Sequence, residues 1–304
     1  MNGLKISKRA RSNLLLILVA IIWGTSFVAQ KRGVGTLKPN TFNGIRTMLG
    51  ALALVPVILF QSRIKKDKQT VIKQNPKTLI KAGIICGILL CSAGTTQTVG
   101  LLYADAGKAG FITALYIILV PLFGVIAGKR LKPLLAVGVA AATVGLYFLC
   151  VKDFGSFRFE KGDLWLFACA ILFSFHILAI DYFSPQTDGV KLSCLQFFVS
   201  ASINIVLMFV FEKPALSEIL SCWFPIFYAG VMSCGVAYTL QVVAQKNTDP
   251  TVASILMSME SLFALLAGIA FGETPSARKL IGCAFMMAAI ILAQLPDKKG
   301  DKNV

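Results

Sequence analysis

Few residues of this chain could do chemistry, and three of them lie inside long apolar runs. Glu260 is at the centre of the run 250–271, and Arg46 is about one and a half turns into the run 41–61. His176, the only histidine, is in the middle of another run. Because a charged side chain is costly at the centre of a bilayer, such groups usually face a wet cavity or a partner. These three residues are therefore the first candidates for a polar site.

Each of the three permits a functional and a structural interpretation. Glu260 could bind a substrate amine or carry a coupling proton, or it could hydrogen-bond another helix. Arg46 could hold a substrate carboxylate through two nitrogens, extend to the outer headgroups, or bind another helix permanently. His176 could shuttle protons, or it could be a satisfied polar group between helices.

Neutral polar and aromatic side chains could complete the same site without the cost of charge. Hydroxyls and amides can line a polar cavity, although serine and threonine also hold helix pairs together. Aromatic rings can form its wall or contact a cation through their faces. The candidates of this kind are Thr25, Ser26, Gln97, Tyr238, Gln241, Trp23 and Tyr116. With one histidine and no Cys-x-x-Cys spacing among the eight cysteines, we expect no metal site and no cofactor.

The composition places these residues in a membrane protein. Of the 304 residues, 56% are hydrophobic and 14% are charged, whereas soluble domains are about a quarter charged. The formal net charge of +16 would suggest nucleic acid as the partner of a soluble protein. Here no RNA-binding motif accompanies the charge, and we interpret the lysines and arginines as topology signals. We expect one integral membrane unit in the lipid bilayer and no nucleic-acid partner.

Ten apolar runs of membrane-spanning length predict ten transmembrane helices. Long, unbroken runs indicate helices, because the strands of a barrel would show short alternating segments. Asp249-Pro250 is a helix-start signal and places the start of the ninth helix at residue 250. The runs are 12–30, 41–61, 82–102, 108–128, 133–151, 164–183, 192–211, 222–243, 250–271 and 278–295.

The distribution of Lys and Arg predicts the orientation of these helices. With a cytoplasmic N-terminus, 19 of the 30 Lys and Arg residues fall on the inner side, 10 on the outer side, and Arg46 within a span. An excess of basic residues marks the cytoplasmic side of a membrane. We therefore expect a multi-pass protein of the plasma membrane with both termini in the cytoplasm.

A weak internal repeat relates the two halves of the chain. Residues 122–128 and 262–268 both read Leu-Phe-x-x-x-Ala-Gly. Five helices per half is an odd number, so the halves enter the membrane from opposite sides and form an inverted repeat. We expect helices 1–5 within residues 12–151 and helices 6–10 within residues 164–295. Duplicated halves of this kind are typical of carriers that alternate access around a shared site.

Pairs of small residues spaced four apart predict seams where helices pack closely. Such spacing lets two helix backbones approach each other. We interpret the pairs as packing features with no role in binding. They are Gly83 and Gly87, Gly138 and Ala142, Ala141 and Gly145, and Ala284 and Ala288.

Several of these residues together resemble the motifs of one transporter family. The motifs are Trp23-Gly24-Thr25-Ser26-Phe27, Phe42…Arg46, Gly107–Ile112 followed by Val120-Pro121-Leu122, and Glu260 with Gly272-Glu273. In this order and spacing they resemble the EamA-type transporters of the drug/metabolite transporter superfamily, with two EamA units in tandem. The resemblance implies a ten-helix inverted-repeat carrier with a central cavity, most often an exporter of small metabolites.

One position departs from that family. The ninth helix of the family often contains Glu-Pro, where this chain has Glu260-Ser261, while the fourth run keeps a proline in Val120-Pro121. Since proline interrupts a helix, we expect a proline-induced break in the fourth helix and none in the ninth.

These observations favour a secondary transporter that exports small polar metabolites such as amino acids. Its site would lie near Glu260, His176 and the Thr25–Ser26 pair. No Gly-x-x-x-x-Gly-Lys-Ser/Thr motif is present, so a gradient or downhill flow must supply the energy. We do not expect an enzyme, because an intramembrane active site would need clustered acids and bases. A passive channel or a non-transporting scaffold stays an alternative, and a homodimer is left open.

Overall fold

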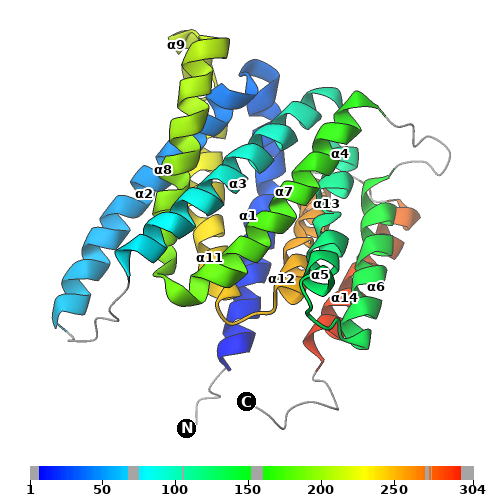
Figure 1. Cartoon of the computed structure of the whole chain (residues 1–304). Coiled ribbons are helices and arrows are strands. Elements are labelled where there is room, and N and C mark those ends of the chain that lie inside the picture. The colour runs from blue at the N-terminus through cyan, green and yellow to red at the C-terminus, as the bar shows by residue number, and fades with distance from the viewer. Residues whose placement is uncertain are drawn as a thin grey trace.

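The protein is built from helices. The computed structural model describes residues 7–67, 75–104, 106–151, 160–270, 274 and 276–295. Within these ranges all regular secondary structure is helical (Figure 1). The all-α class predicted from the long apolar runs is thereby confirmed.

The helices follow the predicted runs closely. The first half contains α1 (Lys8–Thr36), α2 (Pro39–Asp67), α3 (Pro76–Tyr103), α4 (Ala106–Thr113), α5 (Tyr116–Ile126) and α6 (Pro133–Cys150). The second half begins with α7 (Lys161–Phe183), the 3-10 turn η1 (Ser184–Gln186), α8 (Gly189–Leu207) and the π-helical turn η2 (Met208–Glu212). It continues with α9 (Leu216–Ser221), α10 (Trp223–Phe227), the π-helical segment η3 (Tyr228–Tyr238), α11 (Thr239–Gln245), α12 (Pro250–Met257), α13 (Glu260–Ala270) and α14 (Ala277–Gln294).

Seven helical stretches of the described chain are long and apolar enough to cross a membrane. The first, ninth and tenth predicted runs coincide with α1, with α12 and α13 together, and with α14. A multi-pass membrane protein is therefore established, while the number ten stays a prediction. The seven stretches are Pro39–Arg63, Pro76–Tyr103, Ala109–Ile126, Pro133–Cys150, Lys161–Gln186, Gly189–Glu212 and Trp223–Gln245.

The start of the ninth run is capped as predicted. The side chain of Asp249 accepts hydrogen bonds from the backbone N–H groups of Thr251, at 2.8 Å, and Val252, at 3.4 Å. Pro250 occupies the first helical position, where its missing N–H leaves nothing unsatisfied. The sequence signal at Asp249-Pro250 thus fixes the beginning of α12.

Both the fourth and the ninth run are broken near their middle. The fourth is interrupted at Ala114 and Leu115 between α4 and α5, and the ninth at Ser258 and Met259 between α12 and α13. The expectation of a break in the fourth helix alone is therefore wrong. Pro121 lies within α5, well beyond the first break.

Hydrogen bonds around Ser258 accompany the second break. The hydroxyl of Ser258 donates to the carbonyl oxygen of Ile255 at 2.8 Å, and the N–H of Met259 bonds to Leu256 three residues back at 3.3 Å. Glu260 is the first residue of the helix that follows the break.

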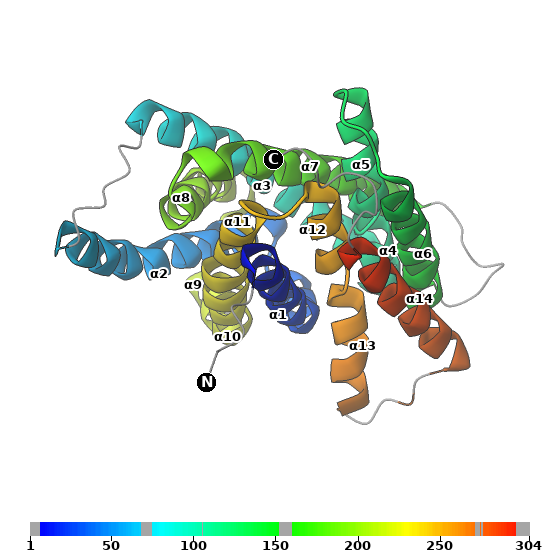
Figure 2. The same ribbon diagram turned by 90° about the horizontal axis from the view of Figure 1, so that it is seen from below.

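The strongest packing contacts join helices of opposite halves. α6 packs against α14, α2 against α8, and α3 against α7. Seen along the bundle, α1 lies between α11 and α13, both from the second half (Figure 2). The two sequence halves are therefore interleaved and do not form separate bundles.

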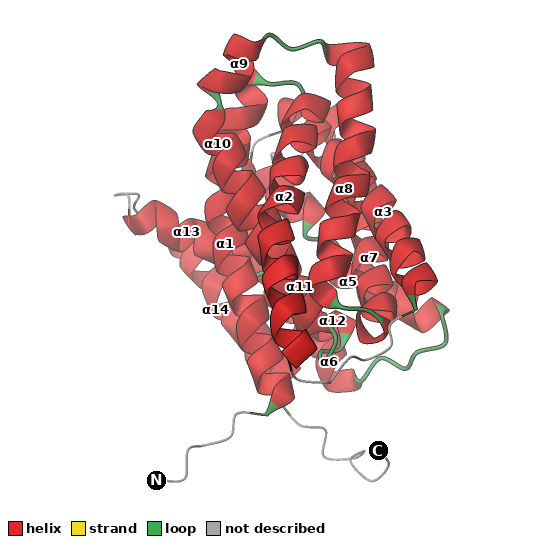
Figure 3. Cartoon of the chain, turned by 90° about the vertical axis from the view of Figure 1, so that its left-hand side faces the viewer, coloured by secondary structure: helices red, strands yellow, loops and turns green. Residues whose placement is uncertain are grey.

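Glycine seams tighten several of these contacts. Gly87 of α3 packs against α8, and Gly145 of α6 packs against Gly282 of α14. The predicted seam at Ala284 and Ala288 is wrong, because both residues are exposed. The first turn of α1 and the last turn of α14 lie at the same end of the molecule, opposite α9 (Figure 3). We call the end of the molecule that holds the start of α1 and the end of α14 the terminal end.

Candidate functional site

Most of the predicted site residues line one cavity between helices of both halves. We call it the central cavity. The predicted residues on its wall are Trp23, Arg46, Gln97, Tyr116, His176, Tyr238, Gln241 and Glu260. Residues not in the predicted set also line it: Gln30, Thr113, Phe173, Ile177, Ser233 and Met257. The fold thus brings together eight predicted side chains that are up to 237 residues apart in the chain.

The central cavity is narrow in this conformation. The centres of water-sized molecules can reach about 40 Å³ of it, and one water requires roughly 10–15 Å³ on this measure. It therefore has room for about three waters. A metabolite larger than that can enter only if the surrounding side chains or helices move apart.

Glu260 provides the acidic group of the cavity. Its side chain is buried, with 6% of the residue exposed, and it stands at the first position of α13. The N-terminal turn of a helix favours a nearby anion through its dipole and free N–H groups. Within the described part of the chain the carboxylate has no hydrogen bond or ion pair. Glu260 is therefore available to a ligand.

Arg46 provides the positive charge. It is 4% exposed, so it does not extend to the headgroups, which removes one of the three interpretations. Its Cζ lies 5.4 Å from the centre of the Phe42 ring, close enough for a cation–π contact. Its Nε has no hydrogen-bond partner, and no carboxylate among the described residues pairs with it. A second buried charge thus lines the cavity without a fixed counter-ion.

His176 is fully buried and only half satisfied. Its Nε2 lies 3.0 Å from Oε1 of Gln196, whereas its Nδ1 has no partner within the described residues. A neutral imidazole that donates from Nε2 leaves Nδ1 as an acceptor. The Gln196 contact supports the interpretation of His176 as a group that joins α7 to α8, with one acceptor left on the cavity wall.

Aromatic side chains enclose the space between these polar groups. The rings of Trp23 and Tyr238 are 4.7 Å apart between centroids, and the rings of His176 and Tyr238 are 6.1 Å apart with an edge-to-face geometry. Such contacts hold the rings in place while leaving their polar atoms free. Tyr238 therefore connects α1 and α7 at the cavity wall.

Several polar atoms on the wall are buried and have no partner in the described part of the chain. Buried polar groups are nearly always satisfied by protein or by water. These atoms offer both donors and acceptors, which suits a polar ligand or a few ordered waters. They are Nε1 of Trp23, Nε of Arg46, Oγ1 of Thr113, the hydroxyl of Tyr116, Nδ1 of His176 and Oε1 of Gln241.

Thr25 and Ser26 do not line the cavity, contrary to expectation. The hydroxyl of Thr25 lies 2.7 Å from that of Tyr228 and so links α1 to η3. The hydroxyl of Ser26 is fully buried and donates to the carbonyl oxygen of Ile22 at 2.7 Å. Both hydroxyls are used in helix contacts, and neither residue is on the cavity wall, although Ser26 is only three positions from Trp23 on α1.

The residues that were missed could have been found from helical spacing. Residues three or seven apart share a helix face. Thr113 precedes Tyr116 by three positions, Phe173 precedes His176 by three, Met257 precedes Glu260 by three, and Gln30 follows Trp23 by seven.

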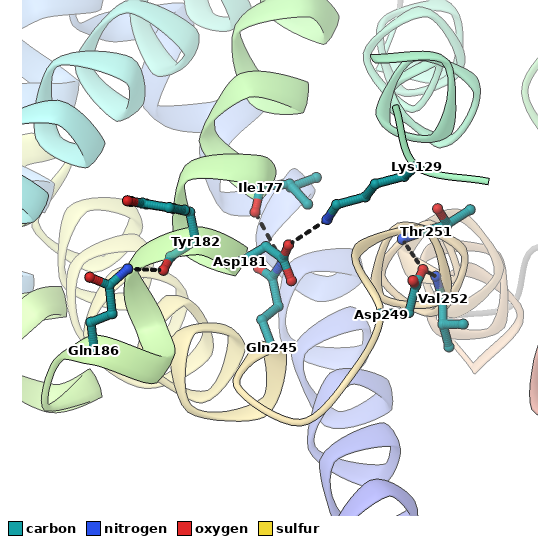
Figure 4. A network of polar contacts seen from close by, with 9 residues as sticks. All are labelled: Lys129, Ile177, Asp181, Tyr182, Gln186, Gln245, Asp249, Thr251 and Val252. Carbon is teal, nitrogen blue, oxygen red and sulfur yellow. Dashed lines mark hydrogen bonds and ion pairs between the residues drawn. The ribbon is translucent and has the colours of Figure 1, made fainter. Parts of the chain in front are cut away.

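A second hollow opens at the terminal end, and we call it the terminal hollow. The centres of water-sized molecules can reach about 280 Å³ of it. Its basic wall residues are Arg9, Lys129, Arg130 and Lys132. Nζ of Lys129 forms an ion pair with Asp181 of α7 at 3.1 Å, next to the capped start of α12 (Figure 4).

The terminal hollow and the central cavity follow each other along the same helices. On α7, Leu178 lines the hollow and Ile177 lines the cavity. On α5, Val120 lines the hollow and Tyr116, one turn away, lines the cavity. Neighbouring residues of the same two helices therefore line the two spaces.

Comparison with known proteins gives a consistent result. The model of the EamA-like transporter family matches residues 10–151 and again residues 160–295. A protein of Archaeoglobus fulgidus named "Uncharacterized transporter" is 30% identical over 95% of this chain and 87% of its own. "Uncharacterized transporter YoaV" of Bacillus subtilis is 22% identical over 83% of this chain and 86% of its own. A solved structure titled "Crystal structure of protein" superposes with a TM-score of 0.76 at 20% identity, covering 94% of this chain and 96% of that one.

Proposed function

Because the chain belongs to the EamA-like transporter family of the drug/metabolite transporter superfamily, we propose that it exports small polar metabolites across the plasma membrane by alternating access. The central cavity is the proposed binding site. One observation supports this site: Glu260 and Arg46 are both buried and line the same cavity. Neither forms an ion pair with another residue that the structure describes.

The charges of the cavity suggest the class of substrate. Burying an uncompensated charge is costly, so a ligand that neutralises both groups at once is strongly favoured. An amino acid or a related compound carries both an ammonium group and a carboxylate. In the proposed complex Glu260 receives the ammonium group and Arg46 binds the carboxylate, while the unsatisfied hydroxyl, amide and indole groups hold the remaining polar atoms.

The path of the substrate is proposed to begin at the terminal hollow. With both termini in the cytoplasm, as the lysine and arginine distribution predicts, this hollow faces the cell interior. The substrate would move from the terminal hollow past Leu178 and Ile177 into the central cavity. There it would reach Glu260 and Arg46. The inverted repeat of ten spans would then provide a second, equivalent exit on the outer side.

Glu260 is also the proposed coupling group. The chain has no nucleotide-binding motif, so the energy must come from a gradient or from the substrate's own concentration difference. A carboxyl group that binds either a proton or a substrate ammonium group would exchange one for the other. Such an exchange couples export to proton entry.

A reconstitution experiment tests the proposal. Purified protein in liposomes loaded with unlabelled amino acids should accumulate the matching labelled amino acid by counterflow, with saturation and stereoselectivity. Replacing Glu260 by Gln should lower the rate by at least about tenfold and remove its dependence on pH. The control is Glu218→Gln, since Glu218 lies on α9 and is exposed.

The competing functions predict different results. A passive channel would give flux that does not saturate, and a scaffold would give none for any substrate. If E260Q leaves the rate and its pH dependence unchanged, the assignment of Glu260 is wrong even if transport is observed.

A further inference from the structure

The two ionisable residues of the central cavity share one packing feature. The backbone of each touches a glycine of another helix. A Cβ atom placed on Gly24 of α1 would lie 2.6 Å from the carbonyl oxygen of Glu260 and 3.0 Å from the N atom of Ala264. A Cβ atom placed on Gly230 of η3 would lie 2.9 Å from the carbonyl oxygen of Arg46 and 2.8 Å from Cβ of Leu49.

These contacts are reciprocal between the two halves of the chain. Gly24 belongs to the first half and touches Glu260 of the second, whereas Gly230 belongs to the second half and touches Arg46 of the first. The backbone of each ionisable residue is therefore in contact with a glycine of the opposite half of the chain. Gly50 extends the second contact, because a Cβ atom there would lie 3.0 Å from the carbonyl oxygen of Gly230.

The geometry leaves no room for a side chain at either glycine. Small residues allow helix backbones to approach closely, and each contact includes a backbone carbonyl oxygen, which cannot rotate away as a flexible side chain can. An added methyl group must therefore push the two helices apart. Because Glu260 and Arg46 themselves provide the touching oxygens, their carboxylate and guanidinium groups must move with the backbone.

We propose that Gly24 and Gly230 are positioning residues that fix the carboxylate of Glu260 and the guanidinium of Arg46 at the separation required by the substrate. The role in substrate binding rests on the proposed function of the central cavity. The positioning itself is a property of the two helix contacts and can be measured without transport.

The chain offers two matched controls. Gly145 and Gly282 form an equally close contact between α6 and α14, where a Cβ atom on Gly145 would lie 2.9 Å from the carbonyl oxygen of Gly282. Neither residue lines the central cavity. Gly35 lies on α1 like Gly24, but a Cβ atom there would meet nothing within 4 Å.

The experiment compares Gly24→Ala and Gly230→Ala with Gly145→Ala and Gly35→Ala. Three quantities are measured for each purified variant: its thermal unfolding midpoint in detergent, its half-saturation concentration and maximal rate in amino-acid counterflow, and its rates of chemical modification. A hydrophobic carbodiimide reports on Glu260 and phenylglyoxal on Arg46, with the modified peptide identified by mass spectrometry.

The proposal expects a selective effect. Gly24→Ala should change the modification rate of Glu260, and Gly230→Ala that of Arg46, by at least about threefold, and both should raise the half-saturation concentration by about tenfold, since displacements below 1 Å already impair a binding site. Gly145→Ala should lower the unfolding midpoint to a similar extent but leave the modification rates and the half-saturation concentration unchanged. Gly35→Ala should behave as the unmodified protein.

Three results would overturn the proposal. The first is that Gly24→Ala and Gly230→Ala change only the unfolding midpoint. The second is that Gly145→Ala alters the modification rates equally. The third is that neither cavity variant folds while Gly145→Ala does, which would make the two glycines purely structural. If no substrate is transported at all, the proposed function fails, but the modification rates still decide the positioning role.

Discussion

The binding properties of the central cavity depend on single residues. The most informative are those whose buried polar groups have no partner among the described residues. A buried charge without a counter-ion destabilises a protein unless water or a ligand compensates it. Glu260 and Arg46 are both buried ionisable groups, and neither has an oppositely charged partner among the residues that the structure describes. A purely structural role would have left each with a fixed partner, as Lys129 has in Asp181.

The geometry of Arg46 can be separated from its charge. Arg46→Lys keeps a positive charge but loses the planar fork that binds a carboxylate through two parallel hydrogen bonds. We expect the half-saturation concentration for amino acids to rise by roughly tenfold, the equivalent of about 1.4 kcal/mol, with a larger rise for Arg46→Gln. Counterflow measures both, and Arg63→Lys, at an exposed position of α2 that lines neither the central cavity nor the terminal hollow, is the control. If Arg46→Lys leaves the half-saturation concentration unchanged, charge alone is recognised.

We expect His176 to contribute mainly to the stability of the protein, through its hydrogen bond to Gln196. His176→Gln places an amide close to the position of Nε2 and can keep a hydrogen bond to Gln196. His176→Ala removes the bond and leaves the buried amide of Gln196 unsatisfied, which should destabilise the protein by about 1–3 kcal/mol. Thermal unfolding in detergent should therefore show a clear drop for His176→Ala and a small one for His176→Gln. A loss of pH-dependent transport in a stable His176→Gln variant would instead point to a proton-carrying role.

The sequence indicated the charged members of the site but not all of its neutral members. A charge in an apolar run is a strong signal because of its cost in lipid, and Glu260, Arg46 and His176 were identifiable on that ground. Thr25 and Ser26 carried the same polar signal but face helix neighbours. A hydroxyl is inexpensive to bury against a backbone carbonyl, so its presence alone does not distinguish packing from binding.

At the scale of elements, helix ends control where the site residues point. α12 is only eight residues long, and Asp249 holds its first turn through two backbone N–H groups. The same short helix carries Met257 to the cavity wall. The orientation of α12 is therefore linked to the shape of the cavity.

The cap of α12 leads to a stability prediction. Asp249→Ala removes both accepting contacts and should cost about 1 kcal/mol, the usual value for losing an N-cap. Asp249→Asn keeps an accepting oxygen and should cost much less. The two unfolding midpoints, measured side by side in one detergent, test this. If the alanine and asparagine variants unfold at the same temperature, the contribution of the cap is negligible.

The extent of the helices was predictable from the sequence, whereas their interruptions were not. Apolar length fixed the runs, because only a continuous helix satisfies the backbone in lipid. The break at Ser258 escaped notice because it has no proline. At the break the hydroxyl of Ser258 bonds to Ile255. The same bond elsewhere leaves a helix continuous, as at Ser254, which bonds to Thr251 within α12, so a serine alone does not predict a break.

At the scale of the whole molecule, the interleaving of the halves changes the expected motion. Carriers built from repeats are often described as two halves that rock against each other. Here α2 packs against α8 and α6 against α14, so rocking of the complete halves would break the largest contacts. Movement is better assigned to groups of helices drawn from both halves.

The direction of export depends on which end of the molecule faces the cytoplasm, and impermeant labelling can establish it. Ser217 of α9 and Arg130 beside the terminal hollow are both exposed and lie at opposite ends. The predicted orientation places Ser217 outside and Arg130 inside, since basic residues gather on the cytoplasmic side. In a background without the eight native cysteines, a membrane-impermeant maleimide should label Ser217→Cys in intact cells. It should label Arg130→Cys only after the membrane is made permeable. The reverse pattern would place the terminal hollow outside the cell, and it would then receive substrate for uptake.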